Sequence, residues 1–148
     1  MNLSTLKTAI DANPDKNWDW AALSRHPDIT LTYINTHPTK NWDYYSLSHN
    51  TGILFSEIIA NPSLPWNWDK VSCRSDITIQ DIIYNIEKSW NWDNLSKNNS
   101  LSIEDVRNNI DLPWNFSLVS CYKNTSLDDL TNYPTKGWCY KSICAKYV

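Results

Sequence analysis

The sequence predicts an all-α solenoid with five repeats, each 24 positions long, and a half repeat at each end. Three observations predict this fold class. A tryptophan recurs at every 24th position from Trp18 to Trp138, without one insertion or deletion. Each tryptophan is followed at fixed distances by an aromatic, an aliphatic and a small residue. The segments between them carry helix-capping residues, and the units are too short to bury a core alone. Such units persist only where neighbouring repeats cover their apolar faces.

Four columns of residues define the repeat. The tryptophan column consists of Trp18, Trp42, Trp66, Trp90, Trp114 and Trp138. Two and five positions later come the aromatic and aliphatic columns, which run from Trp20 and Leu23 to Tyr140 and Ile143. A serine follows the aliphatic in five copies, and Cys144 takes its place in the sixth. We predict that the serine allows close helix packing and that its hydroxyl is bonded to backbone.

A first helix, helix A, is expected directly after each tryptophan. Preferred N-cap residues follow the tryptophan in five copies, namely Asp19, Asp43, Asn67, Asn91 and Asn115. The tryptophan then stands just before the cap, and the aliphatic takes the fourth helical position. These are the two positions of a hydrophobic staple. The tryptophan column is therefore expected to form a buried structural ladder, not a stacking platform for sugars or bases.

A second helix, helix B, is expected in the other half of each repeat. Capping-box spacing occurs at Thr78 with Asp81, and the later copies repeat it at Ser102 with Asp105 and at Ser126 with Asp129. Asparagines mark the expected helix exits at Asn13, Asn61, Asn85 and Asn109. Helices of about two turns are not stable alone in water, so the repeats must support one another. No linker is evident, and a single domain over residues 1–148 is expected.

Composition argues against several classes of protein. The formal net charge of −3 does not suit a protein that coats nucleic acid. No signal peptide and no membrane-spanning apolar stretch is readable, which favours a cytoplasmic setting. Two glycines exclude a glycine-rich phosphate loop, and the four cysteines are expected to be free thiols without metal-binding spacing. His26, His37 and His49 lie in turns or at a helix end, so we expect no catalytic site, no cofactor and no metal.

Charged residues at outward positions are the candidate partner-binding residues. The basic candidates lie in helix A or the turn after it, and the acidic candidates lie at the starts of helices B. They are Arg25, Lys70, Arg74 and Lys97, and Glu57, Asp81, Glu104 and Asp128. In stacked repeats they would form a basic ridge and an acidic ridge. Helix macrodipoles alone favour the same distribution, but two opposite ridges could also orient a partner.

The segment NPDKNWDWAALSRHPDIT, residues 13–30, resembles a known tandem repeat. Repeats of the form N-P-x-x-x-W-D-W-x-x-L-S-x-N-P-x-I-T occur in uncharacterised proteins of giant, mimivirus-like DNA viruses. The likeness extends from about Asn13 to Ile143, although His26 and Pro27 stand where the pattern has Asn-Pro. The short helix pairs are also similar to leucine-rich-variant repeats. The resemblance implies a virus-encoded protein in the cytoplasm of an infected host, but it implies no activity and no site residues.

Three functions stay open on this basis, in the following order. The first is a non-enzymatic scaffold or adaptor that binds a protein partner along its stacked surface. The second is a structural component of a virion or viral factory that self-assembles through its terminal helices, because Trp138, Tyr140 and Ile143 keep the last helix apolar. The third is nucleic-acid binding by the basic ridge, for which Arg74 and Lys97 would be the residues to reverse.

Overall fold

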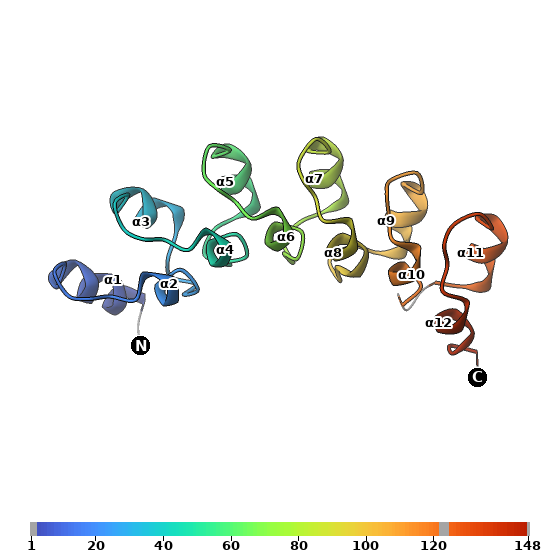
Figure 1. Cartoon of the computed structure of the whole chain (residues 1–148), viewed down its shortest axis with the longest axis horizontal. Coiled ribbons are helices and arrows are strands. Elements are labelled where there is room, and N and C mark those ends of the chain that lie inside the picture. Colours follow the sequence, from blue (N-terminus) through green and yellow to red (C-terminus); the bar gives the residue numbers. More distant parts are fainter. Residues whose placement is uncertain (1–2, 122–124, 148) are drawn as a thin grey trace. The chain divides into compact units, whose positions relative to one another are not determined.

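The computed structural model describes residues 3–121 and 125–147, and all regular structure in these ranges is helical (Figure 1). The all-α solenoid class is thereby confirmed. Helices of type A begin at a constant interval of 24 positions and are α2 (Trp20–Leu23), α4 (Tyr44–Leu47), α6 (Trp68–Val71), α8 (Trp92–Lys97), α10 (Phe116–Val119) and α12 (Tyr140–Cys144). Those of type B are α1 (Leu3–Ala12), α3 (Leu31–Thr36), α5 (Phe55–Ala60), α7 (Ile79–Tyr84), α9 (Ile103–Asn108) and α11 (Leu127–Asn132).

The chain divides into two compact units between Asn67 and Trp68. Unit 1 contains α1 to α5, and unit 2 contains α6 to α12. Within unit 2, helices α7, α9 and α11 form one layer, while α6, α8, α10 and α12 form the other (Figure 1). The single domain expected over residues 1–148 stays a prediction.

The helices begin where the capping residues predict. Asp19, Asp43, Asn91 and Asn115 are the N-caps of α2, α4, α8 and α10, and each side chain accepts a backbone N–H of the first turn. Capping boxes join Thr78 to Asp81, Ser102 to Asp105 and Ser126 to Asp129. Leu54 stands at the N-cap of α5, where the carboxylate of Glu57 accepts its backbone N–H at 2.8 Å. At these helices local sequence therefore determines where the helix starts.

Most A helices are shorter than the two turns predicted. Helices α2, α4, α6 and α10 have four residues each. One reason is visible after α2, where the carbonyl of Ser24 accepts the side-chain amide of Asn50 at 2.8 Å. Because that carbonyl bonds to the next repeat, it is directed out of the helix and the chain turns. Asn98 makes the same bond to the carbonyl of Ser72 after α6, so at these two helix ends a contact with the next repeat accompanies the turn.

The core follows the predicted columns. In the aliphatic column, Leu47, Val71, Leu95, Val119 and Ile143 are fully buried, and Leu23 is half-buried. In the tryptophan ladder, Trp66, Trp90, Trp114 and Trp138 are buried, whereas Trp18 and Trp42 are half-buried. Each buried aliphatic contributes about 1.5–3 kcal/mol through removal from water. The apolar columns therefore supply the main cohesion within each unit.

Candidate binding surface

The two aromatics of each repeat have different structural roles. All six indole N–H groups of the ladder donate to the carbonyl five residues earlier, at 2.8–3.0 Å, which ties the entrance of helix A to the exit of helix B. The second aromatic instead meets the ladder tryptophan of the next repeat edge to face. These pairs are Trp20–Trp42, Tyr44–Trp66, Trp68–Trp90, Trp92–Trp114 and Phe116–Trp138, with ring centroids 4.8–5.4 Å apart. Such geometry adds about 0.5–1.5 kcal/mol per pair beyond burial.

The serine column joins consecutive repeats by hydrogen bonds. All five serines are fully buried, and each hydroxyl accepts the backbone N–H of the residue 19 positions later, at 2.8–2.9 Å. Four of them also donate to the carbonyl four residues earlier, at 2.6–2.8 Å. The predicted bond of the serine hydroxyl to backbone is confirmed. The additional bond, accepted from the backbone N–H 19 residues later, links neighbouring repeats. These serines are structural and do not line a groove.

A further column of buried polar residues, eight positions after Trp42, Trp66 and Trp90, was not foreseen from the sequence. Buried Asn50 donates to the carbonyls of Ser24 and His26, at 2.8 and 3.0 Å. Asn98 does the same with Ser72 and Arg74, at 3.0 and 2.8 Å. Each asparagine thus fastens its own turn to the turn of the preceding repeat.

Arg74 occupies this same column, so its predicted outward position is wrong. Only 3% of its side chain is exposed, and its Nε and Nη2 atoms both donate to Asp76, at 2.7 Å. The turn around Arg74 buries the guanidinium together with a fixed carboxylate partner. Arg74 is therefore not part of an exposed basic ridge. It was one of the two residues on which nucleic-acid binding was expected to depend.

The other predicted ridge residues differ in exposure. Arg25, Lys97, Glu104 and Asp128 are exposed, whereas Lys70, Glu57 and Asp81 are half-buried. Arg25 donates through Nε to the hydroxyl of Ser46 in the next repeat, at 3.4 Å. This partner lies outside the set of eight candidates, so the contact does not join two ridge residues into a site.

Three of the acidic candidates have local structural partners. Glu57 and Asp81 accept backbone N–H groups at the starts of α5 and α7, and Glu104 pairs with Arg107 one turn later in α9. Capping and helix-surface pairing account for acids at these places without any ligand. Three of the four acidic candidates are therefore engaged within their own helices.

Two depressions in unit 1 form the candidate binding surface. The first has a volume of about 370 Å³ and is lined by Ile10, Asp11, Pro14, Trp20, Tyr33, Thr36, His37 and Lys40. The second, of about 350 Å³, is lined by Ile34, Asn35, Pro38, Lys40, Asn41, Trp42, Tyr44 and Leu64. Five lining positions correspond at the repeat interval: Ile10 with Ile34, Asp11 with Asn35, Pro14 with Pro38, Trp20 with Tyr44, and Lys40 with Leu64. The depression is thus itself a repeated feature, with Lys40 shared by both.

The first depression holds a fixed carboxylate. The Tyr33 hydroxyl donates to Asp11 Oδ1 at 2.8 Å, and His37 Nε2 lies 3.3 Å from the same oxygen. Burial, together with the hydrogen bond to Asp11 and the charge of that carboxylate, raises the pKa of Tyr33. The phenol therefore stays a proton donor at neutral pH and keeps the carboxylate in place.

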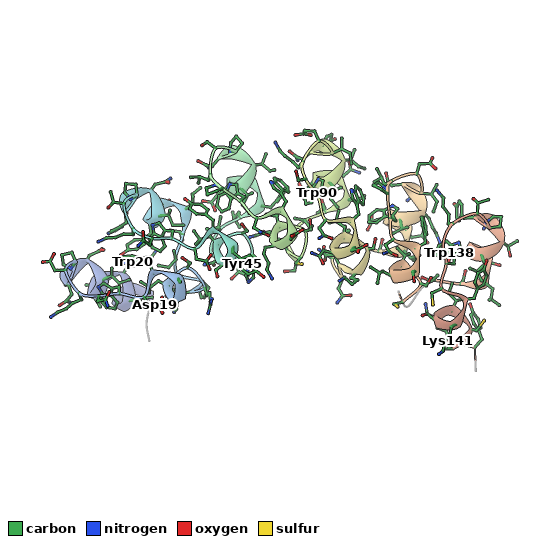
Figure 2. All side chains as sticks on the ribbon, in the orientation of Figure 1. Asp19, Trp20, Tyr45, Trp90, Trp138 and Lys141 are labelled. Carbon is green, nitrogen blue, oxygen red and sulfur yellow. The ribbon has the colours of Figure 1, made fainter. Side chains whose placement is uncertain are left out.

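An aromatic wall and an ammonium group complete the first depression. The wall is the indole of Trp20, the first residue of α2 (Figure 2). The Nζ atom of Lys40 lies 5.1 Å from its ring centroid, a cation–π distance. Lys7 lies at a similar distance, 5.3 Å, from the ring of Tyr33. Apolar walls with a few convergent polar groups are typical of binding sites.

One signal in the sequence could have pointed to this site. Asp11 lies in the last turn of α1, where the helix macrodipole disfavours an acid. An acid at such a place needs a partner, and the partners prove to be Tyr33 and His37, about one repeat further along the chain. The sequence does not show that these residues lie close together in space, so the site could be recognised only in the folded structure.

The described ranges contain no candidate metal site and no disulfide. No group of three or more His, Cys, Asp or Glu residues there could hold a metal ion. The four cysteines are free thiols, three of them exposed and Cys139 half-buried. No protein-family model, curated protein or solved structure matches the chain.

Proposed function

We propose that this protein is a non-enzymatic helical-repeat scaffold that binds a segment of a protein partner across the two depressions of unit 1. The observation that carries the proposal is their repetition: equivalent residues line both depressions, one repeat apart. Both volumes fall in the range of about 300–1,000 Å³ that is common for ligand sites. A surface that repeats itself suits an elongated partner that can place one side chain in each depression.

The distribution of polar partners supports this choice of surface. The column serine hydroxyls, the buried asparagine amides and the ladder indole N–H groups bond to backbone within each unit, so these polar groups build the scaffold. Asp11 and Lys40 instead direct their side chains to the first depression, and Asn35 lies at the second. These three residues are the ones we expect a partner to contact.

The setting we propose is the cytoplasm of a host cell infected by a giant virus. The support for it is the likeness of residues 13–30 to the tandem repeats of such viruses. In addition, none of the helices in the described ranges has the length and apolar character needed to cross a bilayer.

The proposal is tested by affinity capture from infected-host lysate, with and without nuclease. Asn35→Arg places a long charged side chain in the second depression. Thr32→Arg is the matched control, since Thr32 is exposed on the same helix, α3, and lines neither depression. We expect a near-stoichiometric protein to be captured by the parent chain and by Thr32→Arg, and to be lost with Asn35→Arg. Equal capture by both variants would contradict a partner site at these depressions.

A second candidate function, self-assembly, is favoured by Tyr140. Its counterparts Trp20, Tyr44, Trp68, Trp92 and Phe116 each pack against the ladder tryptophan of the next repeat, whereas Tyr140 is 58% exposed. This aromatic could meet the equivalent surface of a second copy. A mass that rises with concentration and returns to the monomer value in Tyr140→Asp would support assembly, and a strict monomer at high concentration would exclude it.

A further inference from the structure

The first depression contains two charged groups with unused hydrogen-bonding capacity. Asp11 Oδ1 is bonded to Tyr33 and lies near His37, but Oδ2 has no partner among the described residues. Lys40 Nζ contacts the ring of Trp20 and, within the described ranges, no hydrogen-bond acceptor. One free acceptor and one free donor therefore line the same cavity, beside an apolar wall of Ile10, Pro14 and Trp20.

This combination discriminates between classes of ligand. An anion would meet the carboxylate of Asp11, and a cation would meet the ammonium of Lys40, so each would bring two like charges together. A neutral group that carries both a donor and an acceptor satisfies both residues. The peptide group is such a group, since each non-proline residue has one N–H and one C=O that need partners on burial.

We propose that the first depression binds one residue of an extended peptide segment of the partner. Its aromatic or large apolar side chain packs against Trp20, Pro14 and Ile10. Its flanking backbone donates an N–H to Asp11 Oδ2 and accepts a hydrogen bond from Lys40 Nζ. The inference rests on the proposed scaffold function and specifies the chemistry of its partner at this depression.

The arrangement around Asp11 prepares it for this role. Tyr33 is buried, with 7% of its surface exposed, and its hydroxyl donates to one oxygen of the Asp11 carboxylate, a residue that lines the cavity. A receptor group that is already oriented loses little freedom on binding, so more of the contact free energy contributes to affinity.

The second depression provides an internal comparison. It has Asn35 and Leu64 where the first has Asp11 and Lys40, so it keeps the apolar wall and has no carboxylate, while Lys40 itself also lines it. The chain itself therefore shows which residues can stand at these positions without loss of the repeat. Asp11→Asn and Lys40→Leu convert the first depression to the residues of the second.

The test is an NMR titration of the ¹⁵N-labelled full chain with two probes. N-acetyl-L-tryptophanamide carries an aromatic side chain flanked by two peptide groups, and indole carries the ring alone. We expect the amide probe to shift the Trp20 indole and Lys40 signals with a dissociation constant on the order of 1 mM. Asp11→Asn should weaken the amide probe roughly 3- to 10-fold and leave indole unchanged. Lys40→Leu, which also changes the contact with the Trp20 ring, should weaken the amide probe more than it weakens indole.

Two further variants make the test decisive. Lys16→Leu changes the equivalent lysine of the preceding repeat, which lines neither depression, and should leave both probes unaffected. Asn35→Asp with Leu64→Lys should give the second depression the same preference for the amide probe. Equal weakening of both probes, or no binding of the amide probe at the first depression, would overturn the inference. Failure of the proposed scaffold function is distinguished by the capture experiment: in that case the Asn35→Arg variant would still capture the partner.

Discussion

Replacing Ser72 by alanine tests whether the serine column holds consecutive repeats together. Ser72 is fully buried, and its hydroxyl accepts the backbone N–H of Asn91 at 2.9 Å while donating to the carbonyl of Trp68 at 2.7 Å. In the alanine variant the Trp68 carbonyl keeps the backbone N–H of residue 72, which lies 2.9 Å away. The N–H of Asn91, which faces the fully buried side chain at position 72, loses its acceptor.

The expected cost is that of one unsatisfied buried donor, about 1–3 kcal/mol in the free energy of unfolding. Urea unfolding followed by circular dichroism measures it, with the denaturant slope compared between variants. Ser75→Ala is the matched control, because Ser75 is exposed in the same unit, and it should change stability by less than about 0.5 kcal/mol. Hydrogen exchange should also show faster exchange at the Asn91 amide. Equal stability of the two variants, with unchanged protection of that amide, would refute the proposed role.

Three other predictions concern single contacts. Gly52→Ala would place a Cβ 2.1 Å from the carbonyl oxygen of Pro27 and should lower the free energy of unfolding by at least about 2 kcal/mol. At Gly137 a Cβ meets nothing within 4 Å, so Gly137→Ala should be neutral. Thermal unfolding of both variants tests this pair of predictions. Burial raises the pKa of Asp129, but the hydrogen bond from Arg107 and the backbone N–H of Ser126 outweigh it and lower the pKa overall. Its contribution to stability is therefore present above the unfolded pKa of about 3.9 and is lost as the pH falls through the folded value. Arg107→Met should cost about 3 kcal/mol at pH 7 and clearly less at pH 3, and an equal cost at both pH values in urea titrations would contradict this. The hydroxyl of Ser142 donates to Cys139 Sγ at 3.1 Å and lowers the pKa of that thiol, so in Ser142→Ala alkylation of Cys139 should set in at higher pH.

The sequence predicted the repeat and its helix starts because these depend on local chemistry. A cap such as Asn91 acts on backbone groups within three residues, and the capping box of Thr78 with Asp81 has the same range. The burial of the aliphatic column followed from its fixed place in helix A. The short A helices were not foreseen, because they end where carbonyls such as that of Ser24 turn to a side chain of the next repeat, that of Asn50.

The depressions escaped prediction for a related reason. In the sequence, Asp11 and Lys40 are two of many surface charges, and nothing local distinguishes them. Their significance comes from Tyr33, which fixes one carboxylate oxygen of Asp11, and from Trp20, over which the ammonium of Lys40 lies. Each of these contacts joins residues that are almost one repeat apart in the sequence. They lie close together only because the repeats stack.

Arg74 shows why charge alone does not identify an exposed residue. It stands at the position where Asn50 and Asn98 bond two carbonyls of the preceding repeat, and there it is buried against Asp76. An arginine can replace an asparagine in this column because the turn supplies polar partners that offset its removal from water. Positions with such a structural duty cannot also select a partner. The pairs Asp11 with Asn35 and Lys40 with Leu64 vary between repeats while the surrounding walls persist, so under the proposed function they are the positions where specificity for a partner can arise.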